Sequence, residues 1–574
     1  MQCFISFYNL LKMKIFNSIL FFLLLSLFVS GQSAGSWYKV RFTDKGQSPY
    51  SISRPAEFLS QRSIERRLSQ QIPLNESDLP VNPEYIQAVL KTGAKIVYTS
   101  KWLNLIIIET QDNNIVNNLK QNRFISSIEP ANQYFIKKQQ SKKKMFFETE
   151  AIEKFNPRLQ VRSPKDSHLM DYGAAFNQVS MINIDEMHAL GFTGKGVTMA
   201  VIDGGFNSAD VMVAFDSIRM GGQVLGTRDF VQPGNNVYGT SMSSHGTMVL
   251  STIAANMPGQ IIGTAPKATF WLLRSEDVLA EYLMEEYYWV NAAEFADSVG
   301  ADIINSSLGY TTFDNPSENH TYDDMDGNTT VVTIGADMAA SKGILVVNSA
   351  GNSGDSQWHY IGAPADGDSV LTVGAVNQNG AYASFSSVGP TSDGRIKPDV
   401  TAQGQNTVVA IVPSGIAQGS GTSFSSPIIA GAAACLWQAN PSYSNMELLN
   451  AIRMSGSLSS SPDNQKGWGI PDFMLANNLL TTTQYQMADP FQKLRVYPIP
   501  FSSNINIELE STKWLMVDLL ITNSTGKVVS EMKGVEINKG LNLIVFNKID
   551  RLPLGVYMVH ITDGTFSVAH KLIK

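Results

Sequence analysis

The chain has 574 residues, a length that predicts roughly three to four domains. Its hydrophobic content of 43% and charged content of 16% are typical of globular proteins, and its net charge of −7 argues against a nucleic-acid partner. Cys3 lies in the leader and Cys435 in an apolar run, so these two cysteines give no disulfide framework.

Residues 1–32 are predicted to be a signal peptide. Lys12 and Lys14 precede an apolar stretch, Ile15–Val29, of about 15 residues, which is shorter than the roughly 20 residues of a membrane span. A short membrane anchor is the alternative interpretation. No later stretch is long and apolar enough to cross a bilayer, so we expect no stable membrane span in the mature protein.

Residues 33–136 are expected to form a small α+β unit. The pattern predicts strands at Trp37–Phe42, Asn104–Thr110 and Ile125–Ile128, and helices at Ala56–Gln71, Pro83–Leu90 and Ile115–Gln121. Arg62, Arg66 and Arg67 form a basic face on the first helix. The next stretch, 137–165, contains Lys142-Lys143-Lys144 and few apolar residues, which indicates an exposed linker suited to maturation cleavage.

Ser423 lies in the motif Gly421-Thr422-Ser423-Phe424-Ser425-Ser426-Pro427, directly before the apolar run Ile428–Ala439. A serine hydroxyl is a poor nucleophile unless it is held beside a base. A tight turn that leads into a helix places Ser423 where free N–H groups face the reacting atom. Pro427 is expected in the first turn of this helix, where the N–H that it lacks would have no partner.

A base, an acid and an oxyanion donor occur upstream. His245 stands at a helix start after two serines, and Gly246 leaves room for another backbone near its ring. Asp203 follows the buried strand Val197–Ile202, at the strand end where open α/β sheets place their sites. Asn352 follows a third strand and offers its amide to a developing oxyanion.

In the order Asp203, His245, Asn352, Ser423, these motifs resemble the subtilisin-like serine proteases, also called subtilases or peptidase family S8. The resemblance implies a secreted endopeptidase that hydrolyses polypeptide substrates through an Asp-His-Ser triad and an acyl-enzyme, with Asn352 binding the oxyanion. It implies that no cofactor is required for catalysis.

The resemblance covers roughly Asp171–Leu480, and we place the peptidase domain at 166–482. It also implies that residues 33–136 are a propeptide, which assists folding and inhibits the enzyme. An unrelated N-terminal binding module is the alternative for that unit.

Five further residues are predicted to bind substrate. Ser307, Leu308 and Gly309 look like the family's segment that pairs with an extended substrate as an added strand. Ala350 and Gly351 precede Asn352 and complete the set. Four positions depart from the common family pattern and are expected to affect pocket shape rather than proton transfer: Met248, Gln403, Phe424 and Ile428.

The alternation of helices and strands in this region predicts an α/β fold. Helix Ala292–Val299 precedes strand Asp302–Asn305, and helix Gly335–Lys342 precedes strand Ile344–Asn348. We therefore expect a parallel-sheet, subtilisin-like catalytic domain, preceded by the small α+β propeptide and followed by a β-sandwich.

The polar loop Tyr310–Thr330, between these two helix–strand pairs, is a candidate calcium site. Asp324, Asp326 and Asn328 place oxygen atoms at alternate positions around a glycine, and Ca²⁺ needs about six to eight oxygen ligands. A solvated loop whose acids cap a helix is the competing interpretation. A structural calcium ion is thus one expectation, and its residues are these three.

Residues 490–574 are predicted to form the β-sandwich. Hairpin turns are expected at Asn523–Lys527 and Thr562–Thr565. Val496-Tyr497-Pro498 and the terminal Lys571–Lys574 resemble the sorting domain of Bacteroidota type IX secretion. This implies the type IX machinery as a partner and a secreted or cell-surface protein that passes through the periplasm. A carbohydrate- or protein-binding sandwich is the alternative.

Two other functions stay open at this point. The first is an inactive subtilase-fold binding protein, which a serine-directed fluorophosphonate would fail to label. The second is a maturase dedicated to one partner, which would be inactive on generic denatured proteins.

Overall fold

The computed structural model describes residues 36–131, 151–154, 170–486, 491–511, 514–523, 527–547, 549–562 and 567–574. The predicted signal peptide 1–32, most of the predicted linker 137–165 and the tips of the two predicted hairpins lie outside these residues. The chain forms two compact units, one that ends at Asn477 and one that begins at Asn478.

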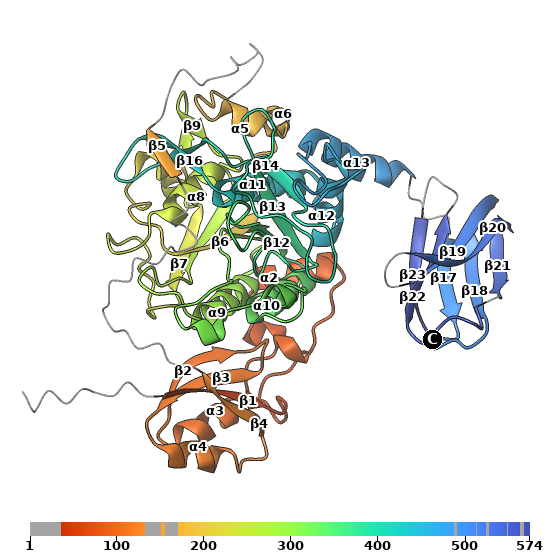
Figure 1. The fold of residues 1–574 in the computed structure, drawn as a ribbon, viewed down its shortest axis with the longest axis horizontal. Coiled ribbons are helices and arrows are strands. Elements are labelled where there is room, and N and C mark those ends of the chain that lie inside the picture. Colours follow the sequence, from red (N-terminus) through yellow and green to blue (C-terminus); the bar gives the residue numbers. More distant parts are fainter. Residues whose placement is uncertain are drawn as a thin grey trace, which may run out of the picture. The chain divides into compact units, whose positions relative to one another are not determined.

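A seven-stranded parallel sheet lies at the centre of the first unit, with the strand order β14-β13-β12-β11-β6-β10-β7 (Figure 1). Helices cover both of its faces, so its central strands are buried on both sides, and their sequences are apolar without alternation. This confirms the predicted α/β class. The strands are β6 (Thr198–Asp203), β7 (Val224–Asp229), β10 (Thr269–Arg274), β11 (Ile303–Ser306), β12 (Leu345–Ser349), β13 (Val370–Val376) and β14 (Val400–Gln403).

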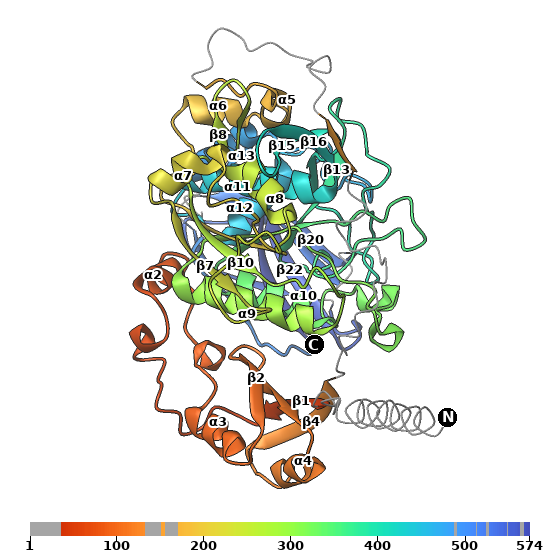
Figure 2. The ribbon, with the colours of Figure 1, turned by 90° about the vertical axis from the view of Figure 1, so that its left-hand side faces the viewer.

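Two helix pairs sandwich this sheet. α8 (His245–Ala254) packs against α11 (Thr422–Ala439), and α9 (Met284–Val299) packs against α10 (Val331–Ser341) (Figures 1 and 2). Both α9 and α10 begin earlier than predicted. Tyr287 and Trp289, which precede the predicted start at Ala292, are buried, so packing holds the first turns of α9.

Shorter elements complete the unit. The helices are α5 (Phe176–Ser180), α6 (Ile184–Ala189), α7 (Asp216–Met220) and α12 (Asn445–Met454), and the 3-10 turns include η8 (Tyr322–Asp324). α13 (Phe473–Gln486) begins in this unit and continues past Asn477 into the second. β8 (Asn256–Met257) pairs with β9 (Ile261–Ile262), and a small sheet has the order β15-β16-β5, from β15 (Thr407–Ala410), β16 (Ile416–Ser420) and β5 (Ala151–Lys154).

The N-terminal part of the same unit is an antiparallel sheet with the order β2-β3-β1-β4. The first four residues of β3, Leu105–Ile108, are all apolar because both faces of the strand are covered there. Ile106 and Ile108 face the core beneath α3 and α4, whereas Leu105 and Ile107 face α9. The elements are β1 (Ser36–Phe42), α2 (Gln61–Ser69), α3 (Pro83–Leu90), β2 (Lys95–Ser100), β3 (Leu105–Thr110), α4 (Asn113–Leu119) and β4 (Ile125–Ala131).

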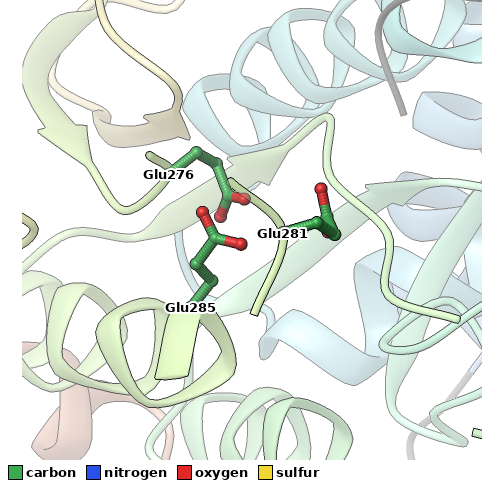
Figure 3. Close-up of side chains that lie close together, drawn as sticks. All are labelled: Glu276, Glu281 and Glu285. Carbon is green, nitrogen blue, oxygen red and sulfur yellow. The ribbon is translucent and has the colours of Figure 1, made fainter. Parts of the chain in front are cut away.

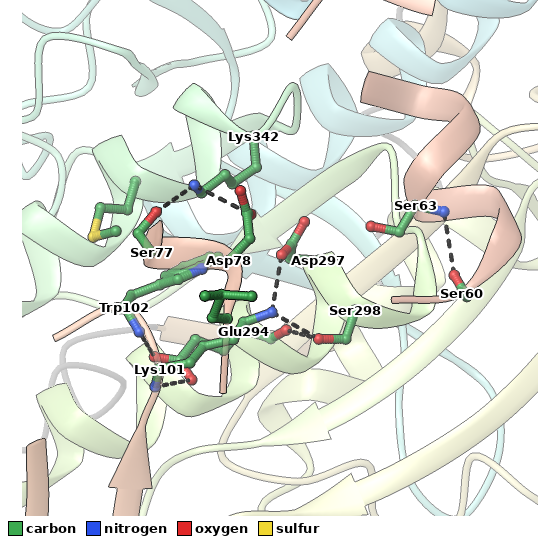
Figure 4. A network of polar contacts seen from close by, with 12 residues as sticks. Ser60, Ser63, Ser77, Asp78, Lys101, Trp102, Glu294, Asp297, Ser298 and Lys342 are labelled. Carbon is green, nitrogen blue, oxygen red and sulfur yellow. Dashed lines mark hydrogen bonds and ion pairs between the residues drawn. The ribbon is translucent and has the colours of Figure 1, made fainter. Parts of the chain in front are cut away.

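Two arginines of the basic face of α2 are buried against α9. Arg66 and Arg67 lie 2.6 and 2.8 Å from Asp297 of α9, and Arg67 lies 2.8 Å from Asp78. Lys101 reaches Asp297 at 3.1 Å from β2's end, as Figure 4 shows. Burial opposes ionisation of Asp297, but these cations outweigh it and hold the pKa of that carboxyl at about 2.

The second unit is a β-sandwich, as predicted. One sheet has the order β17-β18-β21 and the other β20-β19-β22-β23. Alternate residues of β18 are buried, which is typical of a strand with one face on a core. The strands are β17 (Phe491–Tyr497), β18 (Ile505–Ser511), β19 (Leu515–Asn523), β20 (Val528–Ile537), β21 (Gly540–Phe546), β22 (Val556–Thr562) and β23 (Ser567–Ile573).

β20 was not predicted from the sequence. Its alternation breaks at Gly534, which has a φ of 63°, and the partner strand β19 shifts register between Val517 and Leu519. The N–H of Gly534 donates to Asp518 Oδ1 at 2.8 Å and closes this irregularity. A search of the described residues finds no helix with the length and apolarity that a membrane crossing needs.

Candidate active site

The parallel sheet places Asp203 at the carboxyl end of β6. This carboxylate is fully buried, and the N–H of Gly204 donates to its Oδ1 at 2.7 Å. His245 Nδ1 lies 2.9 Å from both carboxylate oxygens. An ionised carboxylate only accepts hydrogen bonds, so Nδ1 carries the proton and Nε2 is left as the basic nitrogen.

Helix α8 begins at His245, so the imidazole stands at the helix N-terminus. The Oγ of Ser243 accepts from the His245 N–H at 3.1 Å and so provides a partner for the first N–H of the helix. Gly246 is required by close packing: a Cβ there would lie 2.3 Å from the carbonyl oxygen of Gly205 and 2.9 Å from the Cβ of Asp203. The glycine therefore allows the first turn of α8 to reach the acid.

Ser423 is the second residue of α11 and is buried. The prediction that Pro427 lies in the first turn is wrong, because Pro427 stands inside the helix. Its missing N–H would have donated to the carbonyl oxygen of Ser423. That oxygen instead accepts from Ser307 Oγ at 3.0 Å. Pro427 and Ser307 thus replace one helix hydrogen bond with a bond that fixes the turn that carries Ser423.

Asn352 is hydrogen-bonded to Thr422, the residue directly before Ser423. Thr422 was not among the site residues predicted from the sequence. The Oδ1 of Asn352 accepts from the Thr422 N–H at 2.8 Å and from Thr422 Oγ1 at 3.0 Å. Thr422 Oγ1 in turn accepts from the Gly351 N–H at 3.1 Å. With its oxygen fixed, Asn352 has its amide NH₂ group as the donor for an oxyanion. In the sequence, the position of Thr422 directly before Ser423 in the Gly-Thr-Ser motif was the feature that could have indicated its role.

The predicted substrate-binding residues gather around this turn. Ser307 and Leu308 directly follow β11 and are buried, and Gly309 is partly exposed. β11 is an inner strand, so this segment leaves the end of the sheet and is not an edge strand. Ala350 and Gly351 directly follow β12. The structure therefore brings all five near Ser423, Asn352 and each other.

The family-divergent positions Met248 and Phe424 pack together. They share a small apolar cluster with Val409 of β15, and the ring of Phe424 lies 6.1 Å from that of His245. Gln403 accepts from Asn177 Nδ2 at 2.6 Å, and Ile428 is fully buried. Their side chains pack in the interior, which agrees with a role in shape.

Three carboxylates lie close together (Figure 3), and one of them, Glu276, interacts electrostatically with Asp203. Oxygens of Glu276, Glu281 and Glu285 lie within 4.8 Å of one another, and among the described residues this is the group close enough for a shared metal ion. Burial, reinforced by nearby Asp203, raises the pKa of Glu276 to about 7 despite hydrogen bonds from Tyr310 and from Ser275. Burial also raises the pKa of Glu285. A raised pKa favours the protonated form, and this lowers the repulsion between the carboxyl groups of Glu276 and Glu285.

The acids of the predicted calcium loop are engaged by their own chain. Asp324 accepts from the Thr321 N–H at 2.7 Å and closes a capping box on η8. Asp326 accepts from the N–H groups of Asn328 and Thr329 at 2.7 and 2.8 Å. These contacts are those of the capping interpretation, and a calcium ion held by Asp324, Asp326 and Asn328 stays a prediction.

Three family models match the chain in succession. The model described as "Subtilase family" matches residues 194–469, which include Asp203, His245, Asn352 and Ser423. The model for the peptidase S8 propeptide domain of Bacteroidota matches residues 37–145. The model for a secretion system C-terminal sorting domain matches residues 495–574.

Individual relatives agree with these matches. Subtilisin NAT from Bacillus subtilis subsp. natto is 34% identical over 278 residues, or 48% of this chain, and the chain spans 64% of that protein's length. Subtilisin from Bacillus pumilus is 34% identical over 278 residues, which cover 88% of that protein. The crystal structure of fervidolysin from Fervidobacterium pennivorans has the same fold at 17% identity, with a TM-score of 0.53 over 92% of this chain and 71% of that one. The identity to the Bacillus pumilus protein extends over most of its length, and the chain therefore belongs to the subtilase family.

Proposed function

We propose that the protein is a secreted serine endopeptidase that cleaves polypeptides through an acyl-enzyme on Ser423. The observation that carries the proposal is the pair of 2.9 Å contacts between His245 Nδ1 and the Asp203 oxygens. This pairing, at the head of α8, leaves Nε2 to act as a base. The helix that carries Ser423 packs against α8.

The first step is attack by the Ser423 hydroxyl on a substrate carbonyl. In the structure this hydroxyl donates to the Ser307 carbonyl at 3.5 Å, a long contact that rotation of the side chain breaks at little cost. His245 Nε2 takes the proton, and Asp203 stabilises the imidazolium that forms. The tetrahedral oxyanion accepts from the Asn352 amide and the Ser423 N–H.

Collapse of this intermediate expels the amine. His245 gives its proton to the leaving nitrogen, and the other half of the substrate stays on Ser423 as an ester. Water then attacks the ester with His245 again as the base, which releases a carboxylic acid and restores the Ser423 hydroxyl. Each proton that leaves an attacking oxygen thus returns through the same imidazole.

The propeptide supplies inhibition in this proposal. Its sheet packs on α9 through Leu105 and Ile107, and α2 binds the end of α9 through Arg66 and Arg67. The C-terminal sorting domain implies secretion or attachment to the cell surface. We propose that the protein first reaches the periplasm and is then exported across the outer membrane by the type IX machinery.

Replacing the nucleophile tests the function. Ser423→Ala removes one hydroxyl from a formed turn, so we expect the fold to persist, hydrolysis of denatured protein to be lost, and labelling by a fluorophosphonate to disappear. If maturation is autocatalytic, the propeptide also stays attached. Circular dichroism checks the fold and gel electrophoresis checks the processing. Normal hydrolysis by the variant would refute the assignment.

A further inference from the structure

Tyr310 directly follows the predicted substrate-binding segment, Ser307–Gly309, and is buried. Its backbone forms a bridge with Ala363: the Tyr310 N–H donates to the Ala363 carbonyl at 2.8 Å, and the Tyr310 carbonyl accepts from the Ala363 N–H at 3.3 Å. Its hydroxyl donates to Glu276 Oε1. The residue that ends the substrate-binding segment is therefore held by its backbone and also by its side chain.

Glu276 lies beside the strand end that carries Asp203. It stands two residues after β10, whose last residue pairs with Asp203 of β6. The N–H of Ser275 donates to the carbonyl oxygen of Asp203 at 3.1 Å, and a Cβ at Gly204 would lie 3.6 Å from the Cβ of Glu276. The hydrogen bond from Tyr310 thus joins the substrate-binding segment to the part of the sheet that holds the triad acid.

The side chain of Glu276 is an acceptor for two hydroxyl groups. Besides Tyr310, Ser275 Oγ donates to its Oε1, at 3.1 Å. The nearby guanidinium of Arg274 pairs with Asp229 at 2.8 Å and donates from Nε to the backbone carbonyl of Glu276 at 3.0 Å. A carboxyl group offers an acceptor oxygen whether it is ionised or protonated, and so does the side-chain amide of a glutamine.

Gly309 depends on its two neighbours for its position. Glycine restricts its own backbone less than any other residue. On one side, the Leu308 carbonyl accepts from Asn348 Nδ2 at 3.0 Å, where Asn348 is a buried residue of β12. On the other side stands Tyr310. The backbone of Gly309 is therefore fixed between the Asn348 contact and the contacts of Tyr310.

From these contacts we propose that Tyr310 and Glu276 are positioning residues that hold Gly309 for pairing with the substrate backbone. The inference rests on the proposed peptidase function and on the predicted role of Ser307–Gly309. Pairing along the substrate backbone is made in the bound substrate and is kept in the transition state. Its loss therefore raises KM and leaves kcat nearly unchanged.

Steady-state kinetics of the matured enzyme on a peptide of several residues test the proposal. Tyr310→Phe removes the donor and Glu276→Leu removes the acceptor, and in each we expect KM about 5- to 10-fold higher with kcat within about 2-fold of wild type. Glu276→Gln keeps an acceptor oxygen and should have nearly the wild-type KM. Tyr172→Phe is the matched control, because that tyrosine is also buried and its hydroxyl lies 2.7 Å from His188 Nδ1. It should leave both constants unchanged.

A double variant shows whether the two residues act through one contact. Tyr310→Phe combined with Glu276→Leu should have a KM no higher than that of the more affected single variant. Unchanged KM in the two single variants overturns the proposal. So does a KM in the double variant that equals the product of the separate effects, or a Glu276→Gln enzyme as impaired as Glu276→Leu.

Labelling by a small fluorophosphonate separates positioning of the substrate from general damage to the site. This reagent has no peptide part, so Tyr310→Phe and Glu276→Leu should be labelled on Ser423 at the wild-type rate. Labelling that falls in proportion to kcat/KM overturns the positioning role. If the wild-type enzyme is labelled and hydrolyses peptides but the variants keep its KM, only this inference is wrong. If the wild-type enzyme is neither labelled nor active, the peptidase function itself fails.

Discussion

The Ser307 hydroxyl is the residue-scale feature that we regard as a positioning group. It donates to the Ser423 carbonyl, the acceptor that Pro427 leaves free within α11. One such hydrogen bond contributes up to about 1.4 kcal/mol, or about 10-fold when it acts on the transition state. Ser307→Ala should therefore lower kcat about 10-fold with little change in KM, and Ser307→Thr should restore it.

Steady-state kinetics on one peptide substrate measure this effect. Ser455→Ala is the matched control, because that serine is also buried and donates to a helix carbonyl, at 2.9 Å from Ile452, on a different helix. It should leave kcat unchanged. An unaltered kcat in Ser307→Ala would show that Pro427 alone sets the turn.

Thr422 is expected to act through Asn352. Thr422→Val removes the hydroxyl that donates to Asn352 Oδ1 but leaves the backbone donor in place. The amide should then be held less firmly toward the oxyanion, and we expect kcat to fall about 10-fold while KM changes little. Thr422→Ser keeps the hydroxyl and should remain near wild type in the same assay. Equal losses in both variants would indicate a packing role for the methyl group instead.

At the scale of elements, the contact between α2 and α9 is dominated by buried charge. Asp297→Asn leaves Arg66 and Arg67 buried beside a neutral amide, and loss of one partner of a buried pair costs about 3 to 5 kcal/mol. We expect the cleaved propeptide to dissociate at least about 100-fold more readily, as measured by its recovery with the enzyme on size exclusion. Asp216→Asn, from an exposed pair with Arg219, is the control and should have no effect.

Mild acidity, down to about pH 4, should not release the propeptide by protonating Asp297 at the contact between α2 and α9. The pKa of Asp297 is depressed to about 2, below its ordinary value of 3.8. The ionised carboxylate therefore stabilises the complex fully above pH 3.8, and this stabilisation is lost only as pH falls toward 2. Buried Glu294 has a raised pKa, so its protonation favours the bound state as pH falls. The complex should therefore persist from pH 7 to pH 4 on size exclusion. Release at pH 5 would point to other groups.

At the scale of the whole molecule, each unit has its own core. The sandwich core includes Ile507, Leu519 and Val559, all of which lie within the second unit. Deletion of Phe491–Lys574 should therefore leave an active peptidase that accumulates in the periplasm, as shown by assays of cell fractions. Residues 490–574 fused to a reporter are the control and should direct its export. Undiminished export of the truncated enzyme would favour a binding role for the sandwich.

The sequence by itself determined the class of the fold and predicted the residues of the candidate site. Each predicted site residue lies in a motif whose local pattern predicts a strand end or a helix start: Asp203, His245, Asn352 and Ser423. Strand ends and helix starts depend mainly on residues that are neighbours in the sequence. The apolar runs of the central strands likewise predicted a parallel sheet covered on both faces. The subtilase prediction is confirmed by the family match.

The tertiary structure alone decided how those motifs are joined. The bond from Ser307 to Ser423 and the link from Thr422 to Asn352 connect residues 116 and 70 positions apart. The burial of Arg66 against Asp297 and the register of β5 on β16 are also long-range. Local pattern cannot fix such pairings, because a hydrogen bond between distant segments depends on where the whole sheet places their ends.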